Sequence, residues 1–419
     1  MGHRGREERV ISSKRLRIGL DATPTGIAGG ERGGVYQYVL QLIRHLSSLA
    51  AESEYRLLFA LTRSRHNAAI QGFLMALDRP NLTAVRCRVP SRWMRRWRIP
   101  VDLWLGRVDV FHAPAHLALT CWSGPLVVTV HDLAYLNDRA GARAPAGMPA
   151  EGSRRWEVRR RFFAELAAET EQTVRRACLV IAVSRSTRED LIAQLGVPAR
   201  KIRVIYNGLR DDVAPVEDPG ALENVRIRYG LSDPYGLYIG GLDPNKNLET
   251  LLEGFARYRR GGGTAMLAMA GNPGWYGPVL QAHAAKLDVA GGVRFLGYVP
   301  DRDLPVLYSG AQWVTMPSPL EGFGLPALEA MGCGTPVIVA NTGALPEVVG
   351  DAGLLVDAES TEEFAQAMHA LMDDTLLHAS LSDAGKIRAK EFSWEQTARE
   401  TLAAYAEAAK GGRELDKDV

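Results

Sequence analysis

The chain has few of the features that would assign it to a function class at once. It contains four cysteines among 419 residues, and none of them lies at CxxC or zinc-finger spacing. We therefore expect free thiols in a reducing compartment rather than a disulfide framework. The formal net charge is only +2, so bulk charge gives no argument for a nucleic-acid partner.

Long apolar segments are also missing. No run of about 18 apolar residues occurs in the sequence, so no membrane-spanning helix is predicted. Residues 1–15 are highly charged and lack the apolar stretch of a signal peptide. We therefore expect a flexible leader over residues 1–15 and a cytoplasmic protein.

The rest of the chain alternates short apolar runs with segments of helical periodicity. Such alternation predicts α/β folding, with parallel sheets covered by helices on both faces. An acidic, proline-containing stretch interrupts this rhythm near residue 215, after which the alternation restarts. The pattern predicts a Rossmann-like domain over 16–210, a linker over 211–222 and a second Rossmann-like domain over 223–392. Ligands of such sheets bind where the strands end, so we expect the site in a cleft between the two domains.

The most informative segment is PSPLEGFGLPALEAMGCGTPVIVA, residues 317–340. It predicts a strand, a glycine-rich loop and a helix that begins near Leu325. The helix N-terminus and the loop amides suit a pyrophosphate. Glu321 in the loop and Glu329 in the helix are then placed to accept hydrogen bonds from sugar hydroxyls. On spacing alone, two solvated carboxylates are an equally good interpretation.

This segment resembles the Glu-x7-Glu motif of glycosyltransferase family 4, the large retaining GT-B family, and the resemblance extends through the following GTPVI. It covers nearly the whole chain from residue 16 onward. It implies that Glu321 contacts the donor sugar, that Glu329 binds the ribose, and that the backbone of Phe323, Gly324 and Leu325 lines the sugar and diphosphate. It also implies an acceptor side in the N-terminal domain, a nucleotide-sugar site in the second domain, and a last helix, 393–419, that crosses back to the first.

A second segment, YIGGLDPNKNLETLLEGF at 238–255, places Lys246 at a strand-to-helix turn. A lysine there is a compact charge for a phosphate, although a lone surface lysine is usually only solvated. The segment is similar to the family's glycine turn and Lys-Asn pattern, which implies that Lys246 binds the donor diphosphate. Many members carry an arginine where this chain has Gly241, which leaves the second phosphate cation unassigned.

Further candidates lie at other predicted strand ends. The resemblance implies that Gly33 and Gly34 approach the donor from the N-terminal domain, and that His131 positions the donor sugar. It also implies that the backbone of Tyr298 and Val299 contacts the nucleobase. Without the resemblance, the glycines predict only a turn and a lone histidine is more often structural. Weaker candidates for the acceptor or phosphate, also at strand ends, are Asp132, His112, Ser184 and Arg185.

Asp301-Arg302-Asp303 has the DxD spacing of metal-binding glycosyltransferases of the other fold, GT-A. It precedes a predicted helix, where aspartate is a common cap. We interpret it as a cap and predict no metal site and no cofactor beyond the nucleotide-sugar co-substrate.

The predicted function is a retaining, metal-independent hexosyltransferase of surface polysaccharide synthesis. The resemblance implies front-face substitution, in which the leaving phosphate takes the acceptor proton. GDP-mannose is the first candidate donor and a UDP-sugar the second, with a saccharide or lipid-linked acceptor and no nucleic-acid partner. Two alternatives stay open, a nucleotide-sugar 2-epimerase of the same fold and a non-catalytic nucleotide-sugar-binding subunit.

A final segment, residues 91–98, concentrates tryptophan and arginine. As a helix it would place Trp93, Met94 and Trp97 on one face, flanked by Arg92, Arg95 and Arg96. Tryptophan prefers the headgroup region of a bilayer and arginine binds anionic lipid, so the segment is a candidate for peripheral contact with the inner membrane face. The alternative is that both tryptophans pack on the domain core and the arginines are solvated.

Overall fold

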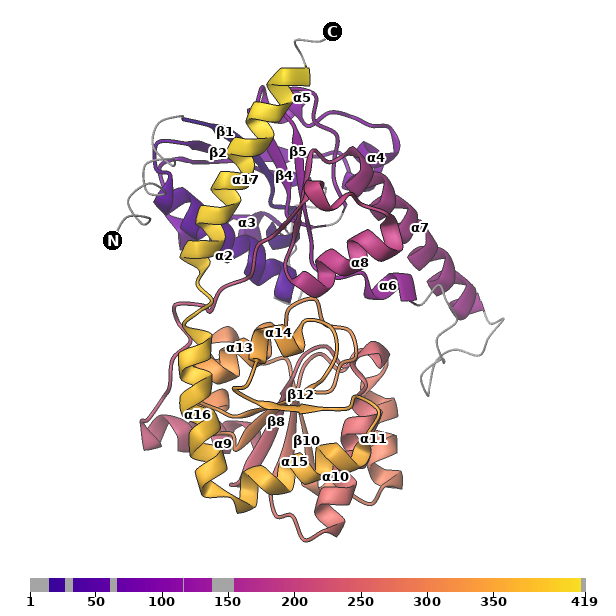
Figure 1. Ribbon diagram of the computed structural model, residues 1–419, viewed down its shortest axis with the longest axis vertical. Coiled ribbons are helices and arrows are strands. Elements are labelled where there is room, and N and C mark those ends of the chain that lie inside the picture. The colour runs from indigo at the N-terminus through magenta and orange to yellow at the C-terminus, as the bar shows by residue number, and fades with distance from the viewer. Residues whose placement is uncertain (1–14, 27–32, 61–65, 116, 138–153, 416–419) are drawn as a thin grey trace.

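The computed structural model describes residues 15–26, 33–60, 66–115, 117–137 and 154–415; the leader predicted over 1–15 lies almost entirely outside this part. Each half of the chain forms one parallel sheet with helices on both faces (Figure 1), which confirms the predicted fold class. The first sheet has the order β3-β2-β1-β4-β5-β6-β7 and the second has the order β10-β9-β8-β11-β12-β13. In both sheets the order reverses beside the first strand, which is where ligands of such folds bind.

The first domain is built from the apolar runs, whose strands are largely buried because helices cover both faces. Its strands are β1 (Arg17–Asp21), β2 (Glu54–Ala60), β3 (Leu82–Cys87), β4 (Val110–Ala113), β5 (Leu126–Val130), β6 (Leu179–Ala182) and β7 (Ile202–Val204). Its α-helices are α2 (Gly34–Leu49), α3 (His66–Leu77), α4 (Ser91–Arg96), α5 (Asp102–Leu105), α6 (Ala134–Asn137), α7 (Arg154–Arg176) and α8 (Arg185–Leu195).

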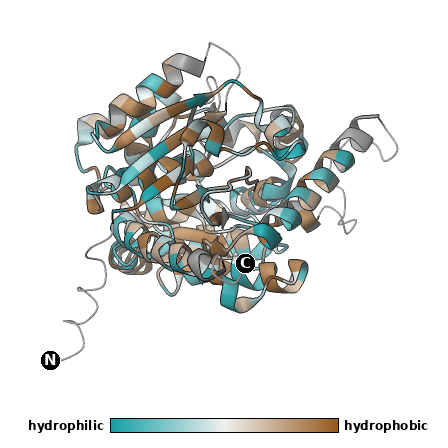
Figure 2. Ribbon diagram, turned by 90° about the horizontal axis from the view of Figure 1, so that it is seen from above, coloured by the Kyte–Doolittle hydropathy of each residue, from teal (hydrophilic) through white to brown (hydrophobic). Residues whose placement is uncertain are grey.

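The second domain repeats the plan. Its strands are β8 (Tyr235–Ile239), β9 (Met266–Ala270), β10 (Val293–Gly297), β11 (Trp313–Met316), β12 (Val337–Ala340) and β13 (Leu354–Val356). Its α-helices are α9 (Pro219–Tyr229), α10 (Leu248–Arg260), α11 (Gly277–Lys286), α12 (Leu304–Gly310), α13 (Leu325–Gly332), α14 (Leu345–Val349), α15 (Thr361–Asp373) and α16 (Thr375–Ala389). Hydrophobic residues dominate the strands, while the covering helices carry both hydrophobic and hydrophilic residues (Figure 2).

The chain passes between the domains twice, and the two crossings lie side by side. Leu209 donates its amide hydrogen to the Phe392 carbonyl at 2.9 Å and pairs with Ser393 in a parallel bridge. The predicted linker, 211–222, is irregular up to residue 218, and its last four residues begin α9.

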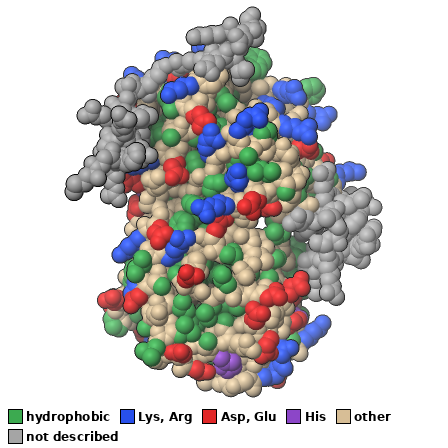
Figure 3. Space-filling model, viewed as in Figure 1, with side chains coloured by type: hydrophobic (Ala, Val, Ile, Leu, Met, Phe, Trp, Pro, Cys, Tyr) green, Lys and Arg blue, Asp and Glu red, His purple; other side chains and the backbone are tan. Residues whose placement is uncertain are grey.

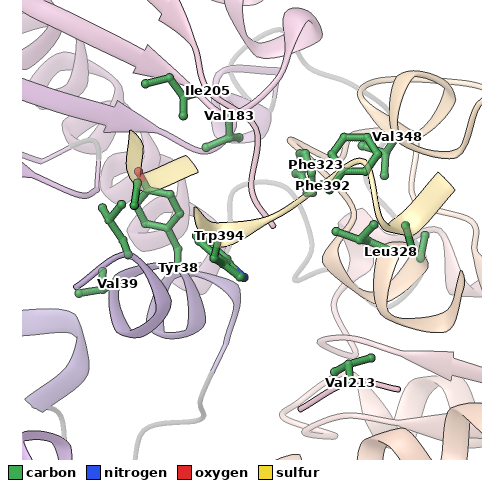
Figure 4. Packing of buried hydrophobic residues seen from close by; sticks show 14 of the residues in the cluster. Tyr38, Val39, Val183, Ile205, Val213, Phe323, Leu328, Val348, Phe392 and Trp394 are labelled. Carbon is green, nitrogen blue, oxygen red and sulfur yellow. The ribbon is translucent and has the colours of Figure 1, made fainter. Parts of the chain in front are cut away.

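After the second crossing, α17 (Trp394–Leu415) runs along the first domain beside α2 (Figure 1). Trp394 lies against Tyr38 of α2, and Phe392 lies against Phe323 of the second domain (Figure 4). The buried apolar core is thus continuous through the crossings.

The Trp/Arg segment forms only the short helix α4, with Trp97 as its C-cap. Met94 is fully buried beside Cys87, whereas Trp93 is 53% exposed and Trp97 is 69% exposed. The interpretation in which both tryptophans pack on the core is therefore wrong, and so is the expected common face with Met94. In the described part of the chain, no helix is long and apolar enough to cross a bilayer.

Candidate active site

A cavity of about 430 Å³ lies between the domains at the carboxyl ends of both sheets. Every residue that we predicted to bind the donor or act in catalysis lines it: Gly33, Gly34, His131, Lys246, Tyr298, Val299, Glu321, Phe323, Gly324, Leu325 and Glu329. The structure therefore brings these residues together from both domains. Their chemical roles stay predictions.

Lys246 and Glu321 form an ion pair in the wall of the cavity. The Lys246 Nζ donates to Glu321 Oε1 at 2.6 Å. Burial alone would lower the pKa of Lys246, but the charge and hydrogen bond of Glu321 outweigh it and the pKa is raised. Asn247, which follows the lysine, anchors the turn through hydrogen bonds to the carbonyls of Pro317 and Ala358. The result is a cation held at a fixed position, already charged at neutral pH.

The glycine-rich loop before α13 needs two of its glycines for different reasons. Gly324 is the N-cap of α13 with φ +98°, which a residue with a side chain rarely adopts. Gly322 has no unusual φ, but a Cβ there would collide with the carbonyl of His131 in the opposite domain. The loop thus presents the α13 N-terminus to the cavity while touching the end of β5.

His131 follows β5 and forms part of the wall from the first domain. Its Nε2 donates to the Pro114 carbonyl at 2.8 Å, and the edge of its ring meets Tyr38 with the ring centres 4.7 Å apart. Burial lowers the pKa of His131, against the opposing effects of the Pro114 carbonyl and Asp132. The ring is therefore neutral and held in one orientation at neutral pH. Asp132 also lines the cavity, and its carboxylate accepts the amide hydrogen of Ala134.

Glu329 also lines the cavity and is 6% exposed on α13. Its Oε2 accepts a hydrogen bond from the Tyr308 hydroxyl at 3.0 Å, and its Oε1 lies 3.5 Å from Arg210 Nε. Burial raises the pKa of Glu329, and Arg210 and Tyr308 oppose that shift. Tyr298, Val299 and Asp301 are near neighbours in the sequence, and all three line the cavity.

Several cavity residues were not predicted from the sequence, among them Gln37, Asn207 and Arg210. Asn207 is buried and its Oδ1 has no hydrogen-bond partner among the described residues. Arg210 precedes two aspartates at the start of an acidic stretch, which is typical of a solvated linker. No spacing or periodicity in the sequence distinguishes either residue, because their burial arises only when the crossing segments meet.

The DxD segment does not act as the predicted cap. Asp303 is the N-cap of α12 but makes no side-chain capping hydrogen bond. Its carboxylate instead accepts hydrogen bonds from Arg228 and from Tyr229 at 2.7 Å. Asp301 Oδ2 accepts one from Gln37 Nε2 at 3.0 Å, across the domain boundary. Within the described residues no three His, Cys, Asp or Glu side chains group as a metal site would require.

Three weaker candidates, His112, Ser184 and Arg185, are not among the residues that line the cavity. His112 is fully buried and its ring nitrogens bond to Tyr405 of α17 at 2.6 Å and to Thr129 at 2.8 Å. Ser184 caps α8 by accepting the amide hydrogen of Thr187. At the same helix end, the main-chain amides of Arg185 and Ser186 donate to the carboxylate of Glu347 in the second domain. That helix end therefore forms a contact between the two domains.

Each half of the chain matches a known protein family. Residues 227–388 match the family of glycosyl transferases group 1, and residues 32–213 match Glycosyltransferase Family 4. A D-inositol 3-phosphate glycosyltransferase of Kribbella flavida is 30% identical over 93% of this chain and 94% of its own length. An O-antigen chain mannosyltransferase B of Escherichia coli is 37% identical, but the match spans only 55% of this chain and 60% of that protein.

Among solved structures, Anabaena HepE in complex with UDP and glucose superposes with a TM-score of 0.68 at 18% identity, covering 94% of this chain and all of that chain. At that identity the likeness concerns the fold alone. Since both domain families cover their respective halves of the chain and a relative matches nearly end to end, this chain belongs to glycosyltransferase family 4, group 1, and has the GT-B fold.

Proposed function

We propose that this glycosyltransferase moves mannose from GDP-mannose to a saccharide or lipid-linked acceptor in surface polysaccharide synthesis, with retention of configuration and without a metal. The observation that carries the proposal is the Lys246–Glu321 pair in the cavity that the α13 N-terminus also faces. The similarity to an O-antigen mannosyltransferase over half the chain supports mannose as the sugar.

The cavity offers the groups that such a reaction needs. Lys246 and the amides at the start of α13 stabilise the negative charge that develops on the leaving diphosphate. Glu321 accepts hydrogen bonds from the sugar, and the neutral His131 orients it. As the bond from the anomeric carbon to phosphate breaks, the acceptor oxygen attacks from the same face. The leaving phosphate oxygen takes the acceptor proton.

A carboxylate at the nucleobase end supports guanine. Asp301 lies two residues after Val299, and both line the cavity. Guanine presents two adjacent N–H donors on its Watson–Crick edge, whereas uracil presents one. A carboxylate accepts both donors of guanine at once, and Asp301 would do so beside its hydrogen bond from Gln37, since each oxygen has two lone pairs.

The test is a product analysis with purified protein, GDP-mannose or UDP-glucose, and a panel of acceptors, with and without EDTA. Transfer from GDP-mannose that survives EDTA and gives an α-linked product by NMR is expected. Activity that is lost with EDTA and restored by manganese would contradict the metal-free mechanism. Formation of an epimerised sugar without acceptor would favour the epimerase, and a complete lack of donor turnover would favour the binding subunit.

We also propose that the acceptor is reached at an anionic membrane surface. Three exposed tryptophans and a leucine lie on neighbouring segments of the first domain: Trp93, Trp97, Trp122 and Leu103. The main-chain amide of Trp122 is held by the carboxylate of Asp102, at the start of α5. Basic side chains gather on the upper right in Figure 3, where Figure 1 places α4. Indole rings with arginines suit the headgroup region of anionic lipid.

Co-sedimentation with vesicles tests this docking. Salt-sensitive binding to anionic but not neutral vesicles is expected, since each basic residue near such a surface contributes about 1 kcal/mol. A variant with Trp93→Ser, Trp97→Ser and Trp122→Ser should lose it. A control at an exposed leucine of the second domain, Leu376→Ser, should bind as the wild type does. Equal sedimentation of the triple variant and the wild type would remove the idea.

A further inference from the structure

The first interdomain crossing places a guanidinium beside Glu329 in the cavity wall. Arg210 lines the cavity and is 3% exposed. Its Nε lies 3.1 Å from Asp212 Oδ1, and its Nη1 lies 3.8 Å from Asp301 Oδ1. Its Nη2 is buried and has no hydrogen-bond partner among the described residues. A buried donor left unpaired is costly, so a ligand that accepts its hydrogen bond would account for it.

The charges around Arg210 indicate what that ligand group is. Three carboxylates, those of Glu329, Asp212 and Asp301, lie within 4 Å of this one guanidinium. The local excess of negative charge repels a phosphate, which rules out the role of a second phosphate cation. A neutral group with an acceptor oxygen fits instead.

The chemistry of the neighbouring carboxylate narrows the choice further. A guanidinium only donates hydrogen bonds and a carboxylate only accepts them. A pair of adjacent hydroxyls does both, so it matches Arg210 and Glu329 lying side by side. The Tyr308 hydroxyl holds the other oxygen of Glu329 at 3.0 Å and keeps the carboxylate in place for this contact.

We infer that Arg210 is a specificity-determining residue that recognises the ribose diol of the donor nucleotide. Its Nη2 donates to one hydroxyl oxygen, while Glu329 accepts the hydrogen of the neighbouring hydroxyl. The inference rests on the proposed nucleotide-sugar site and adds a residue from the first interdomain crossing to it. Arg210 thereby discriminates ribonucleotides from deoxyribonucleotides, whichever base they carry.

The test measures equilibrium binding of four ligands by calorimetry: GDP, UDP and their 2′,3′-dideoxy forms. Arg210→Lys keeps the charge but removes the planar fork that presents Nη2. We expect it to weaken GDP and UDP about tenfold, as loss of one charge-assisted hydrogen bond does, and to leave both dideoxy forms unchanged. Arg228→Lys is the matched control, because Arg228 pairs with Asp303 at an exposed position that does not line the cavity.

With the transferred sugar present, Arg210→Lys should raise the donor KM with little change in kcat, since ribose contacts are the same before and during the reaction. An equal loss for ribo- and dideoxynucleotides would overturn the inference, because a phosphate contact or a folding defect acts on both. Equal wild-type affinity for the two forms would overturn it without any variant. If the lysine variant does not fold, Arg210→Gln is compared in the same way. A wild type that binds none of the nucleotides would instead contradict the proposed function.

Discussion

The two walls of the cavity differ in kind. The second domain supplies Lys246, Glu321 and Glu329, each fixed by contacts inside the protein. The first domain supplies Gly33, Gly34 and a neutral imidazole, with Asp132 as its charged member. We call these the charged wall and the neutral wall, the latter for its uncharged imidazole; under the proposed function the charged wall binds the donor and the neutral wall positions the acceptor. Each prediction below changes one wall, a buried residue of the first domain or the contact between the walls.

The largest effect is expected when the charged wall loses its cation. Lys246→Ala should lower kcat by roughly 100-fold to 1000-fold and raise the donor KM, because charge on the leaving diphosphate grows toward the transition state. Steady-state kinetics with GDP-mannose measures it. Lys386→Ala is the control, since Lys386 pairs with Asp383 on the surface of α16. An unchanged rate in Lys246→Ala would move the phosphate site elsewhere.

The two glutamates of the charged wall should separate kinetically. Glu321→Gln should lower kcat by about 100-fold, because its partner is the reacting sugar. Glu329→Gln should mainly raise the donor KM, by about tenfold, because ribose hydroxyls change little during the reaction. Wild-type kinetics in both variants would contradict the assigned roles, whereas a kcat effect at Glu329 alone would exchange them.

A buried histidine of the first domain, outside the cavity wall, makes folding sensitive to acid. Burial lowers the pKa of His112 from 6.5 to about 3. Between these values the unfolded chain binds more protons than the native protein, so stability falls as the pH falls below 6.5. At pH 5 the loss from this group is about 2 kcal/mol relative to neutral pH. Urea unfolding of the wild type and His112→Gln at pH 7.5 and 5 measures it.

The variant should show a smaller drop in unfolding free energy between the two pH values, even if its stability at pH 7.5 is reduced. His131 has a pKa shifted in the same direction by burial, so some acid sensitivity should persist in His112→Gln. An identical drop in both proteins would mean that His112 is protonated in the native state.

The smallest effect is expected at the contact between the walls. Glu347 of α14 accepts amide hydrogens at the α8 N-terminus and the Tyr206 hydroxyl. Glu347→Gln should weaken the contact between the two domains by about 1 kcal/mol, which is the usual contribution of a charge at a helix end. Small-angle scattering without ligand should then show a larger radius of gyration. Glu362→Gln, at an exposed pair with Arg257, is the control and should scatter as the wild type does.

Much of the cavity could be predicted because its residues lie in local patterns. Strand, glycine turn and helix follow one another within segments 238–255 and 317–340, and the structure has them as expected. The prediction failed where a residue's surroundings come from distant parts of the chain. Asp303 lies at the start of a helix, yet its carboxylate accepts hydrogen bonds from Arg228 and Tyr229 instead of capping the helix. Spacing placed Trp93 and Trp97 on one face with Met94, but Met94 packs beside Cys87 in the core while both tryptophans are exposed.

By itself, the sequence determined the alternation of buried strands and helices, the two-domain plan and the family, because hydrophobic periodicity and short glycine motifs act over neighbouring residues. Tertiary structure alone decided that Arg210 lies in the cavity and that Gly322 meets His131 across the domains. It also decided that the Glu347 carboxylate accepts the main-chain amide hydrogens at the start of α8. These contacts join residues more than 100 positions apart, and burial and charge pairing at that range arise only when both crossings bring the domains together.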